Sequence, residues 1–575
     1  MGFQVDSRNV DNMTRKHVLM FGALCLIVCL MWAYPMLSLH LSDQHDIPTH
    51  LRWSDQFLTA LREGNLMPRW AYASLNGLGD PTFVYYQPLF YYITSIAALF
   101  GLRPERALVV GAAVPYLLLG LVVYRQVFQR YTTRYAMLAT FFIVAGPLVY
   151  FLSVQVGAFP WTLSLPFSIL FAIESTRERP RIARLALLMC AICLSHLLSG
   201  LITLCCVALA RLAFAFPNRS TLPGHVRWGA GVALGIALSA FFIYPAISQQ
   251  HLINPAGWVD GEGVWRKAYV LPVFTVHLGL RWFAIQWPLG LAVAATIVLA
   301  LWPIRGAQPT PANTLARRLS FMAVAAFIFS TEIVYPLYEL LEPLRKIQYP
   351  YRFLFIAGLL ANIALLIRLG EGAFARWGKP VRLAVVAVLL LQCALAAFLH
   401  LSLYRSGGLM PDRETFMSGR FGTAEYHPAV RGAEWKTYAE NGKLPAECAR
   451  LGIGCASIVH RSHDFSATID TPRPVAVRLP LFAYPAWGVK VDGVPQPTVA
   501  DKATGLILVE LPPGRHVVTL AWVRMPSETV GIGISLAALF VLLGVLAWPR
   551  LRRRKTPVQP GTFSAEAVEP GPRTV

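Results

Sequence analysis

The 575 residues carry a formal net charge of +21, yet only 14% are charged, 55% are hydrophobic and the mean hydropathy is +0.51. A soluble protein has about a quarter of its residues charged and lacks repeated apolar runs long enough to cross a bilayer. The composition therefore excludes a soluble protein and predicts a polytopic membrane protein.

The positive charge is distributed in short Arg and Lys clusters between the apolar runs. Clusters of this kind mark loops that stay in the cytoplasm. We therefore interpret the charge as a determinant of membrane topology and predict no nucleic-acid partner.

The first apolar run, His17 to Leu39, lacks a small-residue cleavage site and is too long for the core of a signal peptide, so we predict a retained span. Placing every basic cluster inside gives about twelve spans, with a range of eleven to thirteen, and both termini in the cytoplasm. The predicted spans lie near residues 17–39, 106–124, 136–153, 161–174, 185–198, 199–216, 228–246, 287–304, 319–340, 353–369, 383–404 and 529–548.

One apolar segment, Val84 to Phe100, does not fit this count, because it would place the later basic clusters outside. Its start is rich in tyrosine, which favours the membrane interface. We predict that it is re-entrant or lies along the outer interface. The alternative is that it spans, and that 185–198 and 199–216 form one helix.

Three outer regions follow from this topology, at residues 40–83, 247–286 and 405–527, and the last is long enough for an independent domain. The predicted organisation is a helical membrane core with a first periplasmic loop, a periplasmic β-rich domain, a last transmembrane helix, and a basic, disordered cytoplasmic tail. Their predicted bounds are 1–404 (with the loop at 40–83), 405–527, 528–549 and 550–575.

The later half of the large outer region contains short β-branched or alternating runs separated by Asp492-Gly493 and Pro513-Gly514. Runs and turns of this kind are typical of an antiparallel β-sandwich. The same region holds Cys448 and Cys455, the two cysteines outside the apolar runs. In an oxidising periplasm they are expected to form a disulfide.

The first outer loop contains the densest group of reactive side chains. Asp46 and His50 are four residues apart and would share one side of a helical turn. Such a pair, with His45 beside it, suits proton abstraction or a divalent metal ion, so Asp46 and His50 are candidate catalytic residues and His45, Asp46 and His50 candidate metal ligands. The alternative is a solvated loop in which Asp46 caps a helix.

Several further motifs accompany this loop. They are Pro68-Arg69-Trp70, Gly77 and Gly79, the run Tyr85-Tyr86-Gln87-Pro88-Leu89-Phe90-Tyr91-Tyr92, Ser195-His196, Gln348-Tyr-Pro350-Tyr351-Arg352, and Tyr484-Pro-Ala-Trp487. Together they resemble a family of bacterial membrane proteins described as related to 6-pyruvoyl-tetrahydropterin synthase. That family is akin to the YfhO-like membrane glycosyltransferases and resembles glycosyltransferase superfamily C.

The resemblance implies a fold of about twelve transmembrane helices with a C-terminal periplasmic β-sandwich, in a bacterial inner membrane. It also implies an acidic residue in the first outer loop, beside a cavity that receives a polyprenyl-phosphate sugar. Asp46 matches that residue by position. The superfamily usually has a pair of acids, whereas here the neighbour is His45 and Asp43 lies further back. Whether Asp46 is a base, a metal ligand or an orienting group therefore stays open.

Four other residues are candidates for substrate binding. Arg352 and Gln348 lie at the outer end of a predicted span, where an arginine suits a lipid phosphate. His196 interrupts an apolar run, and Arg69 could bind phosphate or pair with Asp80. The alternatives are an Arg352 that snorkels to the interface and a His196 that only packs.

We predict a glycosyltransferase whose partners are a polyprenyl-phosphate-linked sugar donor, membrane lipid and a glycan, lipid or protein acceptor. Two other functions remain: a transporter or flippase of lipid-linked saccharide, and a non-catalytic envelope assembly protein. A flippase usually shows two related halves, and none is visible here. The sequence does not identify the sugar or the acceptor, and it leaves the metal unknown.

Overall fold

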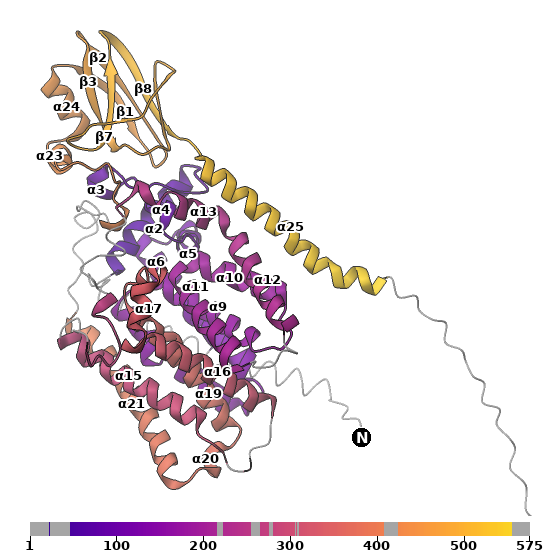
Figure 1. Cartoon of the computed structure of the whole chain (residues 1–575). Coiled ribbons are helices and arrows are strands. Elements are labelled where there is room, and N and C mark those ends of the chain that lie inside the picture. The colour runs from indigo at the N-terminus through magenta and orange to yellow at the C-terminus, as the bar shows by residue number, and fades with distance from the viewer. Residues whose placement is uncertain are drawn as a thin grey trace, which may run out of the picture.

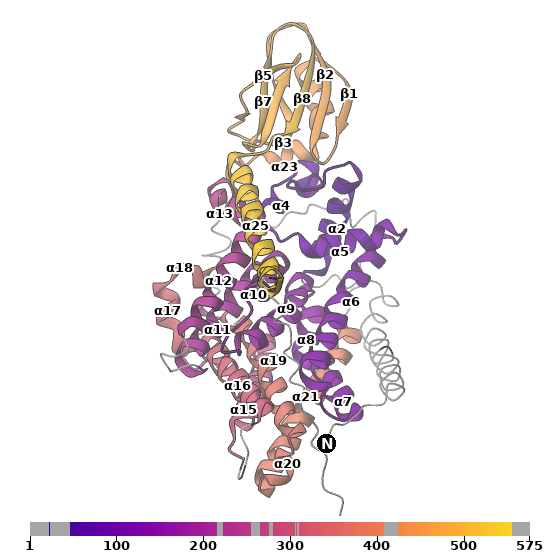
Figure 2. The ribbon, with the colours of Figure 1, turned by 90° about the vertical axis from the view of Figure 1, so that its right-hand side faces the viewer.

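The computed structural model describes residue 22 and residues 46–215, 222–254, 265–274, 280–304, 306, 310–406 and 424–554. These residues form a helical body with a β-domain at one end (Figure 1). The last helix, α25 (Pro526–Arg554), starts at the β-domain and packs on α13 (Ala240–Ser248) and α12 (Leu222–Leu238) (Figure 2). The predicted span at 17–39, apart from residue 22, and the predicted tail after residue 554 lie outside the described residues.

The first outer loop folds into short helices instead of an open loop. Its main helix, α2, covers Ile47–Arg62 and buries one face. It is followed by α3 (Ser74–Gly77), α4 (Thr82–Tyr85) and α5 (Leu89–Leu99). The segment predicted to be re-entrant or interfacial is thus two helices with an extended Tyr86 between them. With 11 residues, α5 is too short to cross a hydrocarbon core of about 30 Å by itself.

Six helical segments among the described residues are long and apolar enough to cross a membrane. Five of them match predicted spans: Pro104–Phe128, Thr133–Gln155, Pro350–Gly370, Lys379–Ser402 and Pro526–Ala547. The sixth, Pro311–Phe329, shares only residues 319–329 with the span predicted near 319–340, because the helix starts earlier and ends at Phe329. A seventh would be the pair α12 and α13, which is bent by 74°.

The predicted count of twelve is therefore not confirmed. Several predicted spans are helices of 10–17 residues, and a helix of 14 residues is about 21 Å long. The apolar run expected at 185–216 breaks at His196, whose backbone is extended, so it is two helices and not one.

The body consists of the helices of these long segments and of the shorter helices around them. Their bounds are α6 (Pro104–Val123), η1 (Tyr124–Phe128), α7 (Thr133–Val144), α8 (Pro147–Tyr150), η2 (Phe151–Gln155), α9 (Phe159–Ser175), α10 (Ile182–Ser195), α11 (Leu197–Leu209), η3 (Ala210–Ala215), η5 (Gln250–Leu252), α15 (Leu280–Leu301), α16 (Pro311–Phe329), η7 (Glu332–Val334), α17 (Tyr335–Leu340), α18 (Glu342–Arg345), η8 (Pro350–Arg352), α19 (Phe353–Gly370), α20 (Ala373–Arg376) and α21 (Lys379–Ser406).

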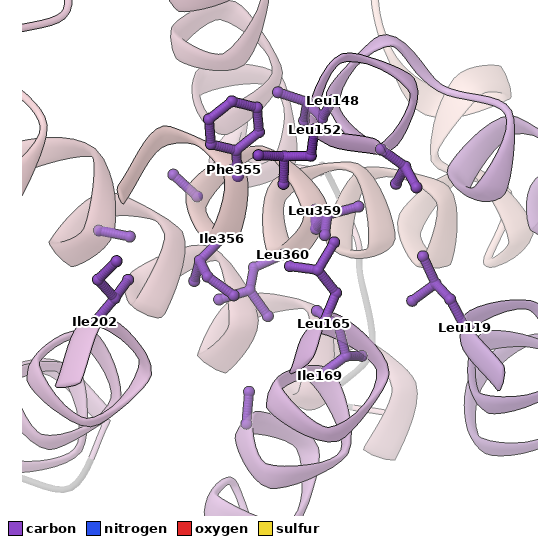
Figure 3. Packing of buried hydrophobic residues seen from close by; sticks show 14 of the residues in the cluster. Leu119, Leu148, Leu152, Leu165, Ile169, Ile202, Phe355, Ile356, Leu359 and Leu360 are labelled. Atoms are coloured by element: carbon purple, nitrogen blue, oxygen red, sulfur yellow. The ribbon is translucent and has the colours of Figure 1, made fainter. Parts of the chain in front are cut away.

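Helix α19 lies at the centre of the body, and 83% of the Pro350–Gly370 segment is buried. Its side chains Phe355, Ile356, Leu359 and Leu360 meet those of α8, η2, α9 and α11 (Figure 3). One polar contact crosses this apolar packing: the amides of Asn362 and Gln392 donate to each other's oxygens at 2.8 and 3.0 Å. Gln392 also donates to the Thr296 hydroxyl at 3.2 Å. These bonds join α19, α21 and α15.

The β-domain contains two antiparallel sheets around one core. One has the strand order β1-β2-β8-β4-β5 and the other β3-β7-β6. The predicted strands correspond to β3 (Val475–Phe482), β4 (Trp487–Val491), β7 (Leu506–Leu511) and β8 (Gly514–Trp522). Asp492 and Gly493 both have positive φ, as a two-residue hairpin between β4 and β5 requires.

The sequence reading missed four strands and three short helices of this region. They are β1 (Gly454–His460), β2 (Asp464–Thr471), β5 (Val494–Gln496), β6 (Val499–Ala500), η9 (Ala424–Tyr426), α23 (Trp435–Glu440) and α24 (Lys443–Leu451). The structure joins Cys448 in α24 to Cys455 in β1 by a disulfide, with Cα atoms 6.2 Å apart.

We expect Gln392→Leu to lower the free energy of unfolding by about 1 kcal/mol, because it leaves the Asn362 amide without a partner in an apolar layer. Chemical unfolding in detergent micelles measures this. The double variant Asn362→Leu/Gln392→Leu should recover part of the loss. If the double variant loses more unfolding free energy than the two single variants lose together, the amide pair does not act as a unit.

Candidate functional site

One cavity of about 480 Å³ lies between the first outer loop, the helical body and the segment that leads into the β-domain. Five of the six residues predicted to bind substrate or act in catalysis line it. They are Asp46, His50, His196, Gln348 and Arg352. Residues that are far apart in the sequence therefore meet at one place.

Asp46 lies at the N-terminus of α2, and its side chain makes no capping hydrogen bond to that helix. Asp46 thus occupies the N-cap position of α2 without a capping hydrogen bond from its side chain, and its catalytic role stays a prediction. The Asp46 N–H donates to the Val156 carbonyl at 3.1 Å, just after the π-helix η2. Next to it, Gly157 has a φ of +71°, and a Cβ there would lie 2.3 Å from Ile47 Cγ1. This close approach sets the position of Asp46.

His50 follows one helical turn later, and its N–H donates to the Asp46 carbonyl at 2.9 Å. The predicted placement of the two side chains on one side of a turn is thus observed. The imidazole is 1% exposed, its Nδ1 lies 2.8 Å from the Tyr91 hydroxyl, and its Nε2 has no hydrogen-bond partner among the described residues. Burial lowers the pKa of His50 to about 3, so the ring is neutral at neutral pH.

Arg352 supplies positive charge to the cavity. Its Nη1 donates to the Ile347 carbonyl at 2.7 Å and its Nη2 to Gln348 Oε1 at 3.4 Å. The guanidinium also lies 5.5 Å from the Trp161 ring centroid and 4.9 Å from that of Tyr349. Gln348 has a φ of +63°, and strained backbone of this kind is concentrated at functional sites.

His196 stacks on the same Trp161, with ring centroids 5.6 Å apart and planes 11° apart. Its Nδ1 accepts from the Ser199 N–H at 3.2 Å, so His196 caps α11. The break that appeared in the sequence as a polar interruption is therefore a helix start at the cavity wall. His196 therefore both caps α11 and lines the cavity.

Four helices of 13 residues or more begin at this cavity, namely α2, α9, α11 and α19. Asp46, Pro160, His196 and Arg352 mark these starts and line the cavity. Because each helix N-terminus carries a partial positive charge, the four starts favour an anion.

Sequence reasoning missed Glu425, which lines the cavity from η9. Burial raises the pKa of its carboxyl, its own N–H and the charge of Arg352 lower it, and the charge of Asp46 raises it. Glu425 thus supplies a second carboxylate close to Asp46. No local pattern around residue 425 marks it, so only the packing of distant segments could have found it.

Lys346, which the sequence analysis did not single out, also lines the cavity. Its ammonium donates to Gln250 Oε1 at 3.1 Å and lies 3.8 Å from Glu342. It is therefore the second cation that reaches the cavity from the segment 346–352.

Arg69, the sixth predicted residue, lies outside the cavity. Its Nε is 2.8 Å from Glu528 Oε1, both side chains are nearly buried, and its Nη2 donates to the Phe241 carbonyl at 2.9 Å. Arg69 does not pair with Asp80, which accepts from the Thr82 N–H at 3.1 Å. Its ion pair with Glu528 connects the first outer loop to α25, and the predicted phosphate binding of Arg69 stays a prediction.

The predicted metal ligands are only partly described. His45 lies outside the described residues, and those that are described contain no group of three or more His, Cys, Asp or Glu side chains suited to a metal ion. The assignment of His45, Asp46 and His50 to a metal therefore stays a prediction.

Comparison with known proteins gives a family. The model of the 6-pyruvoyl-tetrahydropterin synthase related domain, a membrane protein, matches residues 83–401, more than half of the chain. The protein belongs to this family. A comparison with the curated proteins gives no match.

Two solved structures resemble this member of the 6-pyruvoyl-tetrahydropterin synthase related family. One is the arabinofuranosyltransferase AftD from Mycobacteria and the other is the archaeal oligosaccharyltransferase AglB from Archaeoglobus fulgidus. Each shows 15% identity and a TM-score of 0.39 over 74% of this chain. The chain spans 29% of AftD and 63% of AglB.

We expect Gly157→Ala to destabilise the protein by about 1–3 kcal/mol more than Gly64→Ala. Both glycines have positive φ, but a Cβ at Gly64 meets nothing within 4 Å, whereas one at Gly157 meets Ile47. Comparing the thermal unfolding of the two variants measures the effect of the contact with Ile47. Equal losses would show that the approach of α2 to Gly157 tolerates a methyl group.

We also expect the free energy of unfolding to fall as the pH drops below 6.5 toward 3. In that window the unfolded chain protonates His50, while the buried ring stays neutral, so stability decreases by up to about 1 kcal/mol per pH unit. Unfolding at pH 7.5 and 5.5 should show a larger loss for wild type than for His50→Gln. A loss of the same size in both proteins would contradict the burial of a neutral His50.

Proposed function

We propose that the protein is a membrane glycosyltransferase that moves a sugar from a polyprenyl-phosphate donor to a glycan, lipid or protein acceptor. The observation that carries the proposal is the cavity itself. It brings the Asp46 carboxylate together with the cations Arg352 and Lys346, beside helices long and apolar enough to cross a membrane. The resemblance of the first outer loop to superfamily C supports the same reaction.

The residues suit each part of the transfer. The Asp46 carboxylate takes the proton of the acceptor hydroxyl as that oxygen bonds to the anomeric carbon of the sugar. The bond from that carbon to the phosphate oxygen breaks, and its electron pair stays on the departing phosphate. Arg352, Lys346 and the four helix N-termini stabilise the added negative charge. A neutral His50 leaves the Asp46 carboxylate without a competing cation in the adjacent turn.

One side of the cavity is apolar and fits the lipid part of the donor. Leu197 and Leu198 of α11 and Ala246 and Ile247 of α13 line it, and Ile247 is 57% exposed. Because α13 belongs to a bent apolar pair, this side lies next to lipid in a membrane. A polyprenyl chain could leave the cavity there without crossing charged groups.

We place the cavity and the β-domain on the periplasmic side of a bacterial inner membrane, with both termini in the cytoplasm. The basic clusters support this orientation, since the cavity is formed by loops that the clusters place outside. For the metal, Asp46 and Glu425 offer hard oxygen donors, but the described residues do not complete a site of three ligands. The proposal assigns no step to a metal ion.

The test is the incorporation of radiolabelled sugar from polyprenyl-phosphate donors in membranes that hold equal amounts of wild type, Asp46→Asn and Asp55→Asn. We expect Asp46→Asn to lower transfer by at least about 100-fold. Asp55 lies on the same helix away from the cavity, so Asp55→Asn should transfer like wild type.

Equal transfer by wild type and Asp46→Asn would move the catalytic centre away from Asp46. Movement of labelled donor lipid across the membrane without sugar transfer would favour a flippase. Stable capture of envelope proteins by the β-domain, with no dependence on Asp46, would favour an assembly protein.

A further inference from the structure

The segment before the β-domain forms the outer wall of the cavity. Two backbone bonds attach this segment to the second outer loop: the Asn254 N–H donates to the His427 carbonyl at 3.0 Å, and the Ala429 N–H to the Leu252 carbonyl at 2.9 Å. An isolated β-bridge between Ile253 and Pro428 continues this pairing. These backbone contacts fix the positions of Glu425 and Tyr426 at the cavity.

Three aromatic rings that line the cavity meet where this wall contacts the first outer loop: Tyr426 from the wall, and Trp53 and Tyr86 from the loop and the segment after it. Tyr426 lies edge-on to Trp53 at 6.0 Å and to Tyr86 at 6.1 Å, and Trp53 and Tyr86 are 4.6 Å apart. Tyr426 also stacks on Tyr85 with a plane angle of 14°. Rigid aromatic faces beside a few polar groups are typical of small-molecule pockets, and the C–H faces of sugar rings pack well on them.

The carboxylate of Glu425 lies next to these rings. Within the described part of the chain, no side chain donates a hydrogen bond to Glu425 or forms an ion pair with it. The sugar hydroxyl is a neutral donor that a half-buried carboxylate can bind strongly. A purely apolar acceptor would displace water from this carboxylate and offer it no hydrogen-bond donor in return, at a cost in binding free energy.

We propose that this wall is the acceptor subsite and that the acceptor is a carbohydrate, with Glu425 accepting from one of its hydroxyls and Trp53, Tyr86 and Tyr426 packing on its ring. The inference rests on the proposed function. It narrows the acceptor from a glycan, lipid or protein to a glycan. Asp46 then takes the proton of the reacting hydroxyl, and Glu425 orients the sugar through another. The donor phosphate is left to the cations Arg352 and Lys346.

Direct binding tests the inference without turnover. The probes are the methyl glycosides of arabinofuranose, mannose, galactose and glucose, added to the purified full chain in detergent and followed by saturation-transfer NMR. We expect wild type to bind at least one of them, and Glu425→Gln and Tyr426→Leu to raise its Kd about tenfold or more. Glu434→Gln, which changes an exposed carboxylate near the same segment but outside the cavity, should bind like wild type.

The inference is overturned if no glycoside binds wild type, or if binding is unchanged in Glu425→Gln and Tyr426→Leu. This failure differs from a failure of the proposed function. Asp46-dependent sugar transfer to a lipid or peptide without glycoside binding would keep the enzyme and reject the subsite. Glycoside binding that depends on Glu425, without any transfer from polyprenyl-phosphate donors, would keep the subsite and reject the enzyme.

Discussion

The close contact between the start of α2 and the turn at Gly157 determines the geometry of the whole outer side of the cavity. Gly157 has a positive φ and no side chain, and Ile47 occupies the space that a Cβ would need. The bond from Asp46 to Val156 fixes the first residue of the helix. From that point the helical repeat places His50 and Trp53 against the tyrosines of the following segment. The π-helix η2 precedes the turn, and π-helices are frequent at functional sites.

The polar groups of the cavity lie where apolar helices begin, which is where a membrane protein tolerates them best. Carbonyl oxygens and aromatic rings surround Arg352, and His196 satisfies a backbone N–H at the start of α11. An uncompensated charge at such a depth is costly, so charge that faces a cavity usually marks a substrate path. The N-termini of α2, α9, α11 and α19 add to the positive potential. The donor of the proposed function, an anionic, lipid-linked sugar, fits both the charge and the apolar side.

The β-domain and α25 hold parts of the cavity wall in place from outside. The Arg69–Glu528 pair joins the first outer loop to the start of α25, and the Ser535 hydroxyl accepts from the Phe241 N–H at the bend between α12 and α13. Trp70 packs against Trp487 and Trp522 of the β-domain at 5.5 and 5.8 Å. Since these contacts hold the domain against the loop that carries Asp46, the segment with Glu425 stays at the cavity mouth. The residues that line the cavity come from that loop, the helical body and the segment before the domain, so the domain acts by holding the loop and this segment in place.

Several features follow from the sequence because they depend on neighbours along the chain. Apolar length predicts five of the six long segments, β-branched runs and Asp492-Gly493 predict four strands and a hairpin, and a spacing of four places His50 beside Asp46. The basic clusters predict a topology but not the length of each helix. The count of twelve is therefore not confirmed, because α10 and α11 are among the shorter apolar helices of the described residues.

What the tertiary structure alone decided is which residues meet. It placed Glu425 and Asp46, almost 380 positions apart in the sequence, in one cavity with Arg352 and His196, and it paired Arg69 with Glu528. The sequence by itself determined the membrane class, the long helices, the strands named above and the Asp46–His50 turn, because local hydropathy and backbone geometry set these. The composition of the cavity depends on how helices far apart in the chain pack around α19, and no local pattern encodes that packing.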